Sequence, residues 1–118
     1  MPSEPENTKL KIRFLKAFKG DAILISLFEN DTPRNILIDG GEAGTYSDDD
    51  NEPGELKEVI DNIKKKRQKL DLLILTHIDD DHIGGILKWF EEDEKAFEWI
   101  EEVWFNSGGL IAKVLKEP

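Results

Sequence analysis

Residues 70–85 read LDLLILTHIDDDHIGG, an apolar run followed by a cluster of histidines and aspartates and then by two glycines. Residues 70–76 are almost continuously apolar, which is typical of a short strand buried on both faces in a layered α/β sheet. Two histidines and three aspartates follow within residues 77–82. The pair Gly84 and Gly85 then allows close backbone packing as the chain enters a helix. The stretch predicts a polar site at the end of a buried strand.

Three further strands are predicted upstream of this stretch. In the first of them Leu10, Ile12 and Phe14 alternate with basic residues, which is the period-2 pattern of a half-buried strand. Turn signals rich in Gly, Asp, Asn and Pro separate the three segments. Their short connections predict an antiparallel meander. The segments are residues 10–18, 22–28 and 35–39.

Two helices and a last strand complete the predicted elements. Pro53 suits the first turn of a helix, and apolar residues follow it at helical spacing. We interpret the basic run 64–67 as the solvated end of this helix rather than a nucleic-acid contact, because the helix dipole favours cations there. The second helix is predicted at 83–100 and a strand at 102–106. The acidic segment 42–52 is predicted to be a surface loop.

The composition narrows the classes of function. At 118 residues the chain is one domain or a piece of one. Its net charge of −10 argues against a broad binding face for nucleic acid or an anionic membrane. It leaves an anionic substrate open, because bound divalent cations would reverse the local field. The absence of cysteine excludes disulfides and thiolate zinc sites.

The sequence also bears on location and domain organisation. No stretch approaches the length of a transmembrane helix, and the first residues lack the basic and apolar regions of a signal peptide. We therefore expect a cytoplasmic protein with no membrane partner. Residues 1–8 are polar and contain prolines, which predicts a disordered tail before a domain at 9–118.

The histidines and aspartates of the stretch have the composition of a metal site. Side chains at alternate positions of an extended chain project to one side, so His77, Asp79 and Asp81 should converge while Asp80 points away. His82, at the bend into the helix, can join them. Imidazole nitrogen and carboxylate oxygen are ligands of zinc, manganese and iron. The alternative is that Asp81 caps the helix and the other acids face water.

A family resemblance supports the metal interpretation. Residues 76–85, THIDDDHIGG, resemble the His-x-His-x-Asp-His signature of the metallo-β-lactamase-fold hydrolases. The likeness extends upstream to residues 20–22 and 36–41, and it covers residues 10–106. Asp79 stands where the family usually has its second histidine. This His-x-Asp-x-Asp-His form is similar to the hydrolase domain of the ComEC competence-channel proteins.

The resemblance implies a fold and a ligand set. The fold would be the first half of an αββα sandwich, a mixed α/β sheet covered by helices, with 9–118 as the N-terminal half of a metallo-hydrolase domain. His77 and Asp79 would bind one divalent ion, and Asp81 and His82 a second. Asp81 would also orient the bridging water as the catalytic residue. Zinc is the first choice of metal, with manganese or iron as alternatives because Asp79 is an oxygen ligand.

The implied activity is metal-dependent hydrolysis of a phosphodiester or related ester, in a small-molecule or nucleic-acid substrate. The family takes further ligands from its second half, so this chain alone should be catalytically incomplete and should bind metal weakly. Asp39 matches a turn acid of the family and would brace the motif loop; the alternative is an ordinary turn residue. A non-catalytic interaction module, or a small metal-binding protein, is the competing function.

Half a sandwich would leave one sheet face uncovered, and an exposed apolar face drives association. We therefore expect the chain to associate with itself through that face, in addition to the missing C-terminal half as a partner. The candidate residues for the face are the aromatic ones of the last third of the chain, although we expect most of these to be ordinary core residues. They are Trp89, Phe90, Trp99, Trp104 and Phe105.

Overall fold

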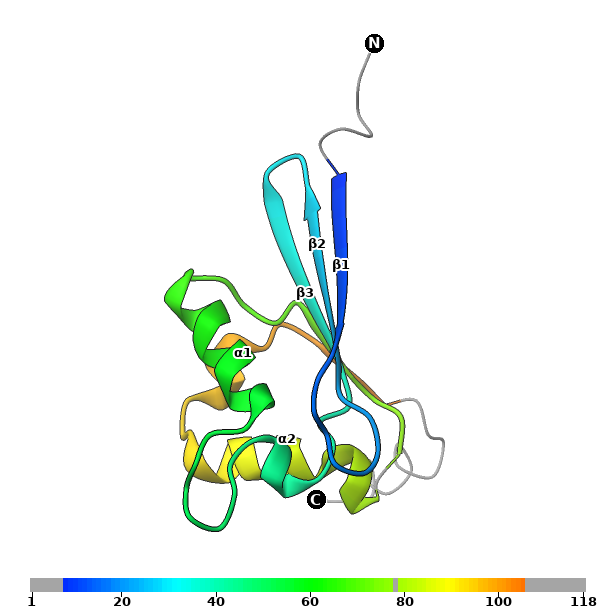
Figure 1. Cartoon of the computed structure of the whole chain (residues 1–118). Coiled ribbons are helices and arrows are strands. Elements are labelled where there is room, and N and C mark those ends of the chain that lie inside the picture. Colours follow the sequence, from blue (N-terminus) through cyan, green and yellow to red (C-terminus); the bar gives the residue numbers. More distant parts are fainter. Residues whose placement is uncertain (1–7, 78, 106–118) are drawn as a thin grey trace, which may run out of the picture.

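The structure is a computed structural model that describes residues 8–77 and 79–105. Within these ranges five strands form one sheet and two α-helices follow strands β3 and β4 (Figure 1). The elements in chain order are β1 (Thr8–Phe14), β2 (Ile23–Glu29), β3 (Thr32–Ile38), the short 3₁₀ helix η2 (Ala43–Thr45), α1 (Glu55–Lys65), β4 (Leu72–Leu75), α2 (Asp80–Glu92), the 3₁₀ helix η3 (Ala96–Trp99) and β5 (Val103–Phe105).

The sheet is mixed, with strand order β1-β2-β3-β4-β5. The first three strands form the predicted antiparallel meander, and β4 and β5 run parallel to β3. Each parallel connection contains a helix, α1 before β4 and α2 before β5, as parallel strands require a crossover. The predicted fold class, a mixed α/β sheet with helices, is confirmed.

The helices cover one face of the sheet and form the core with it. Leu24, Leu37 and Leu73 are register partners across β2, β3 and β4, and all three are buried. The apolar stripe of α1 and the inner side of α2 pack on them, because helical spacing places these residues on one side. Each fully buried side chain contributes roughly 1.5–3 kcal/mol. The helix residues of this core include Leu56, Val59, Ile60, Ile63, Ile86 and Trp89.

The opposite face of the sheet, here called the open face, is also apolar. Register rows run across it, for example Ile12–Ile25–Ile36–Leu72 and Phe14–Ile23–Ile38–Ile74–Trp104. Within the described residues no helix covers it. Leu10, Ile12 and Phe14 are therefore 62%, 52% and 74% exposed. The prediction that this strand is half-buried is wrong, because its apolar side faces away from the helices.

Only one of the five aromatic candidates lies on the open face. Trp104 is the register partner of Ile74 there and is exposed. Trp89 is completely buried in the core beneath the helices. Phe90, Trp99 and Phe105 pack against that same core. The aliphatic residues of β1 to β4, rather than the aromatic ones, make up most of the open face.

We propose that the open face mediates association with a second copy of the chain. Light scattering should then report a dimer or larger species, because a contiguous exposed apolar patch favours burial against a partner. Ile12→Lys should shift this equilibrium toward monomer while leaving the core intact. Lys9→Gln, on the same strand but on the opposite face, serves as the matched control. A monodisperse wild-type monomer would contradict the proposal.

Several predicted boundaries differ from the observed ones. The strand predicted at 10–18 is formed at Thr8–Phe14, and Leu15 and Ala17 enter the core. Of the predicted tail 1–8, Thr8 belongs to β1 and the rest lies outside the described residues. The predicted surface loop 42–52 is partly buried, with Thr45, Tyr46 and Ser47 in its interior. No helix within 8–77 and 79–105 is long and apolar enough to cross a membrane.

The helix predicted to reach residue 100 ends instead at Glu92. Asp93 follows it in extended conformation and accepts a hydrogen bond from Trp89 Nε1 at 3.1 Å. Its carboxylate also forms an ion pair with Lys64. Burial alone would raise the pKa of the Asp93 carboxyl, but the hydrogen bonds from Lys64 and Trp89 outweigh it and lower the pKa. This acid therefore ties the end of α2 to α1.

Candidate metal centre

The predicted motif lies where β4 ends and α2 begins. β4 ends at Leu75, Thr76 and His77 follow, and Asp79 is the residue immediately before α2. Asp39 follows β3, and its backbone N–H donates to the carbonyl oxygen of Ile74 at 2.8 Å. Parallel β3 and β4 thus end at the same edge of the sheet, where ligand sites of α/β folds collect.

Asp39 is buried at this end of the two strands, with 1% of its surface exposed. Its Oδ1 accepts the backbone N–H of Thr76 at 2.8 Å, and its Oδ2 accepts the Thr76 hydroxyl. His82 Nδ1 lies 3.3 Å from the same Oδ2. Asp39 has a left-handed φ of +59°, a conformation that Asp tolerates better than most residues. The prediction that Asp39 braces the motif loop is confirmed.

These hydrogen bonds also set the tautomers of both imidazoles. A carboxylate only accepts, so His82 Nδ1 carries the proton that it donates to Asp39. The Thr76 hydroxyl donates its one proton to Asp39, so it must accept from His77 Nδ1 at 3.0 Å. In the neutral form of each ring, Nε2 then keeps its lone pair. A histidine whose outer nitrogen donates to a fixed acceptor is oriented as metal-ligating histidines are.

The two histidines are brought together as predicted. Their ring centroids lie 4.6 Å apart, and the ring planes are tilted by 40°. Asp81 Oδ1 lies 3.7 Å from His82 Nε2. His82 therefore lies next to His77 on one side and next to the Asp81 carboxylate on the other, at the end of β4.

Asp79, unlike His82 and Asp81, lies just before α2 and faces solvent. It occupies the N-cap of α2, its side chain is exposed, and it makes no capping hydrogen bond. The alternation that was expected to align Asp79 with Asp81 stops there, because the chain is helical from Asp80 onward. The predicted orientation of the Asp80 side chain lies outside what the structure describes.

The donor set suits a divalent metal, although the cluster is only part of a centre. Among the side chains that the structure describes, no three of His, Asp or Glu are grouped closely enough to hold a metal ion. Two imidazole Nε2 atoms and nearby carboxylate oxygens are nevertheless the ligand types of zinc, manganese and iron. A catalytic zinc takes three protein ligands, so the described residues fit one side of such a centre.

Glycines hold the neighbouring backbone against the motif. A Cβ at Gly85 would overlap the carbonyl oxygen of Gly40, and Gly85 N–H donates to the carbonyl oxygen of Gly41 at 2.9 Å. The predicted close packing at Gly84 and Gly85 is confirmed. At Gly20, which has a φ of +78°, a Cβ would overlap the carbonyl oxygen of Asp81. The sequence placed Gly20 in a turn and in the family resemblance, but it gave no sign of this contact with the motif.

Sequence reasoning also missed Thr76 as a positioning residue. Its only local signal is a hydroxyl next to His77 at the end of a buried strand. The hydroxyl acquires its role from Asp39, which reaches it through the pairing of β3 with β4.

Comparison with known proteins agrees with this arrangement. The sequence model of the Metallo-beta-lactamase superfamily matches residues 17–115, a range that contains Asp39, the motif and both α-helices. No curated protein and no solved structure gives a significant match. The mixed sheet with its helices is consistent with part of that fold. Because the match covers most of its length, the chain belongs to the metallo-beta-lactamase superfamily.

Proposed function

We propose that this chain is the first half of a metal-dependent hydrolase domain that acts on a phosphodiester or a related ester. Members of the superfamily usually bind divalent metals. The observation that carries the proposal is the histidine pair at the end of β4. In the neutral form of each ring, the contacts with Asp39 and Thr76 place the proton on Nδ1 and leave Nε2 able to bind a metal. A scaffold without metal chemistry has no need of this arrangement.

The proposed roles follow the motif. His77 and Asp79 would hold one divalent ion, and Asp81 and His82 a second, with zinc, manganese or iron as the metal. Bound ions of this kind lower the pKa of a water molecule and stabilise charge that develops on the electrophile. Asp81 would orient that water. Asp39 and Thr76 act behind the histidines and hold their Nε2 atoms outward.

We propose the ComEC-like subgroup on the ground that Asp79 replaces the usual histidine, and this is the reason for placing phosphodiesters first. We further propose that the remaining ligands come from a C-terminal half. The sequence contains two histidines, and both are already in the motif. The open face offers the surface on which a second sheet could pack.

The competing function is a non-catalytic module or a small metal-binding protein with the same fold. The observation that favours it is that the described residues contain no group of three metal ligands. If the four motif residues bind metal across a dimer, association measured by light scattering should increase with added zinc. An interaction module without metal chemistry should associate equally with and without zinc.

A calorimetric titration of the 118-residue chain with zinc and with manganese tests the proposal. We expect weak binding, with a dissociation constant on the order of 1 μM or higher, because the ligand set is incomplete. His82→Ala should abolish the measurable heat, whereas the exposed acid variant Asp61→Asn on α1 should leave it unchanged. No hydrolysis of bis(p-nitrophenyl) phosphate is expected from this chain.

Two results would overturn parts of the proposal separately. Tight stoichiometric binding would contradict the incomplete site. Equal binding by wild type and His82→Ala would contradict the metal centre itself.

A further inference from the structure

A second feature lies between β1 and α1, away from the motif. A hollow of about 150 Å³ lies beneath the end of α1, and three cationic side chains line it. We propose that this hollow, here called the basic groove, binds the phosphate group of a small organic phosphate. Its polar lining residues include Lys11, Arg13, Ser26, Asn62, Lys66 and Gln68. The inference does not depend on the metal centre.

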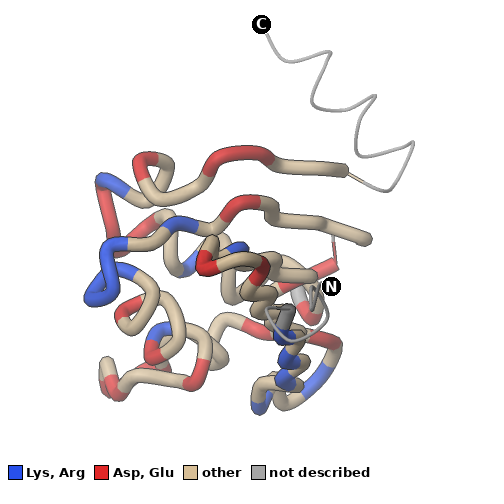
Figure 2. Tube along the Cα trace, turned by 90° about the horizontal axis from the view of Figure 1, so that it is seen from above, with Lys and Arg blue, Asp and Glu red and all other residues tan. Residues whose placement is uncertain are grey.

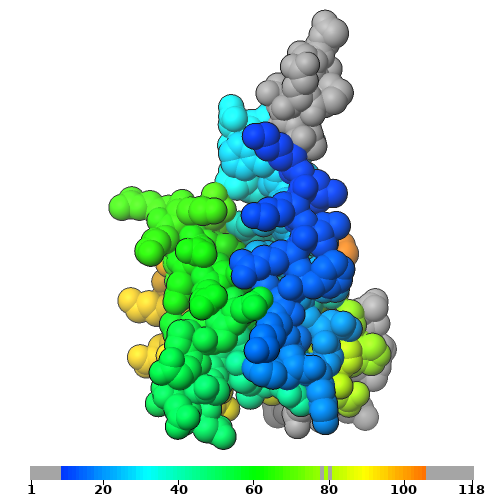
Figure 3. All heavy atoms as spheres, in the orientation of Figure 1, coloured from blue at the N-terminus to red at the C-terminus, as the bar shows by residue number. Residues whose placement is uncertain are grey.

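The strand register explains why the groove is polar. Lys11, Ser26 and Asn35 are register partners across β1, β2 and β3 on the face that the helices cover. Further along the same face, the row through Leu24 and Leu37 belongs to the core. The sheet therefore changes from apolar to polar where α1 ends. Figure 3 shows α1 beside β1, with atoms of β2 and β3 deeper between their upper ends.

The floor of the groove is fixed by hydrogen bonds. The buried Asn35 amide donates to Gln68 Oε1 at 3.1 Å and to the carbonyl oxygen of Lys69 at 2.9 Å. Gln68 therefore cannot rotate freely. A polar surface held in this way can receive a ligand without first being ordered.

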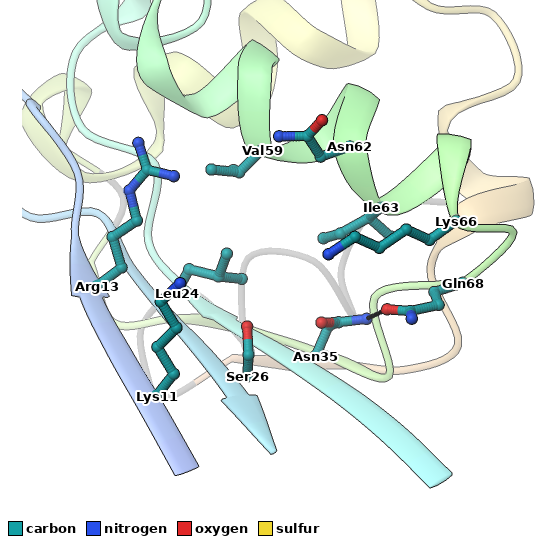
Figure 4. Close-up of a pocket in the computed structure, with 10 residues that line it drawn as sticks. All are labelled: Lys11, Arg13, Leu24, Ser26, Asn35, Val59, Asn62, Ile63, Lys66 and Gln68. Carbon is teal, nitrogen blue, oxygen red and sulfur yellow. Dashed lines mark hydrogen bonds between the residues drawn. The ribbon is translucent and has the colours of Figure 1, made fainter. Parts of the chain in front are cut away.

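The cations of the groove are unusual for this chain. Acidic residues outnumber basic ones by 26 to 16, and Figure 2 shows both signs interspersed along the trace. Within the described residues, Lys11 and Lys66 nevertheless have no carboxylate within ion-pair distance, and Arg13 has only the half-buried Glu55 at 3.7 Å. In Figure 4 the side chains of Lys11 and Lys66 extend toward the same hollow from β1 and from the end of α1, whereas the Arg13 guanidinium lies nearer the start of α1, beside Glu55.

Two simpler explanations account for part of this pattern. Lysines at a helix end offset the helix dipole, and this explains the presence of Lys66. Charged residues on an edge strand discourage pairing with another chain, and this explains Lys11 and Arg13. Neither explanation requires the cations of the two elements to meet over one hollow. Convergence of positive charge on a concave polar surface is what an anion site requires.

The size and surroundings of the groove indicate the class of ligand. The hollow of about 150 Å³ has room for a tetrahedral phosphate group beside the cations that line it. An adjoining hollow of about 490 Å³ shares Lys11 and Lys66 and extends to Phe28 and Pro33. Phe28 is exposed and offers a surface for stacking. A phosphorylated small molecule with an aromatic body, such as a nucleoside monophosphate, fits both parts.

The test is titration of the ¹⁵N-labelled full chain, followed by amide chemical shifts in the presence of a metal chelator. The chelator prevents a metal in the motif from recruiting phosphate, so failure of the metal centre would not affect the result. Adenosine monophosphate should move the signals of Lys11, Ser26, Lys66 and Phe28. Inorganic phosphate should move the first three. Adenosine should bind at least about tenfold more weakly than its monophosphate, because it lacks the charge.

A neighbouring pair of lysines supplies the matched variants. Lys66→Gln should weaken binding of adenosine monophosphate about tenfold, because one charge-assisted hydrogen bond is lost. Lys65→Gln removes the same charge from the same end of α1, but Lys65 does not line the hollow. It should change affinity less than about twofold. Both side chains are exposed, so both variants should fold.

Three outcomes would overturn the proposal. The first is no shift at these positions with phosphate or adenosine monophosphate on the order of 10 mM. The second is adenosine binding as tightly as its monophosphate. The third is equal weakening by Lys65→Gln and Lys66→Gln, which would reduce the effect to general attraction by a basic helix end.

Discussion

Asp39→Ala is expected to lower the free energy of unfolding by about 3–5 kcal/mol, a loss typical of removing the acceptor of a buried hydrogen-bond network. Asp39 accepts the N–H and the hydroxyl of Thr76 and faces His82 Nδ1. Each donor left unpaired in the interior costs about 1–3 kcal/mol. The left-handed φ of +59° adds to the cost, because Ala adopts it less readily than Asp. Urea denaturation followed by tryptophan fluorescence measures the change.

Asp39→Asn separates the structural from the positioning role. The amide keeps the shape of the carboxylate and tolerates a left-handed φ, so we expect a loss of only about 1–2 kcal/mol. Its NH₂ group would donate where Asp39 Oδ2 now accepts. Thr76 would then donate to His77 Nδ1, and both histidines should change to the tautomer with the proton on Nε2.

Imidazole ¹⁵N chemical shifts report these tautomers directly. Asp49→Ala, at an exposed loop acid, is the control and should stay within about 0.5 kcal/mol of wild type. Unchanged tautomers in Asp39→Asn would contradict the proposed positioning role. An Asp39→Ala protein as stable as wild type would contradict the buried network itself.

The fold was predictable where the pattern is local. The alternation of β1, the turns after it and the continuous apolar run of β4 gave the elements and their order. Alternation also divided β1 correctly into an apolar and a basic side. It could not say which side the helices cover, because that depends on where α1 and α2 pack. Because the helices cover the basic side of β1, Leu10, Ile12 and Phe14 are exposed. For the same reason the basic groove forms on the other side of the strand.

The residues of the candidate site were predictable, but their geometry was not. The motif identified His77 and His82, and the rings do lie together. The convergence of Asp79 with Asp81 assumed extended chain, whereas α2 begins at Asp80. The contacts of Asp39 with Thr76 and His82 cross from β3 to the end of β4, and nothing local to any of the three predicts them. Only the family resemblance pointed to Asp39.

Gly85→Ala is expected to destabilise the protein by about 2–4 kcal/mol, because a methyl group there overlaps backbone that cannot rotate away. The overlapping atom is the carbonyl oxygen of Gly40. Helix propensity alone predicts the opposite sign, since alanine is favoured over glycine in a helix by about 1 kcal/mol. The sign of the measured change therefore distinguishes close packing from propensity. Thermal or urea unfolding gives the measurement.

Gly44→Ala is the matched control, since a Cβ there would lie 3.5 Å from Phe18, an ordinary contact. It should change stability by less than about 0.5 kcal/mol. The contact of Gly85 with Gly40 and Gly41 seats the first turn of α2 beside Asp39, and Gly40 N–H donates to the carbonyl oxygen of His82 at 2.7 Å. If Gly85→Ala were as stable as Gly44→Ala, α2 would not be seated there. His82 would then have no fixed place beside Asp39, and the tautomer argument for the metal centre would lose its basis.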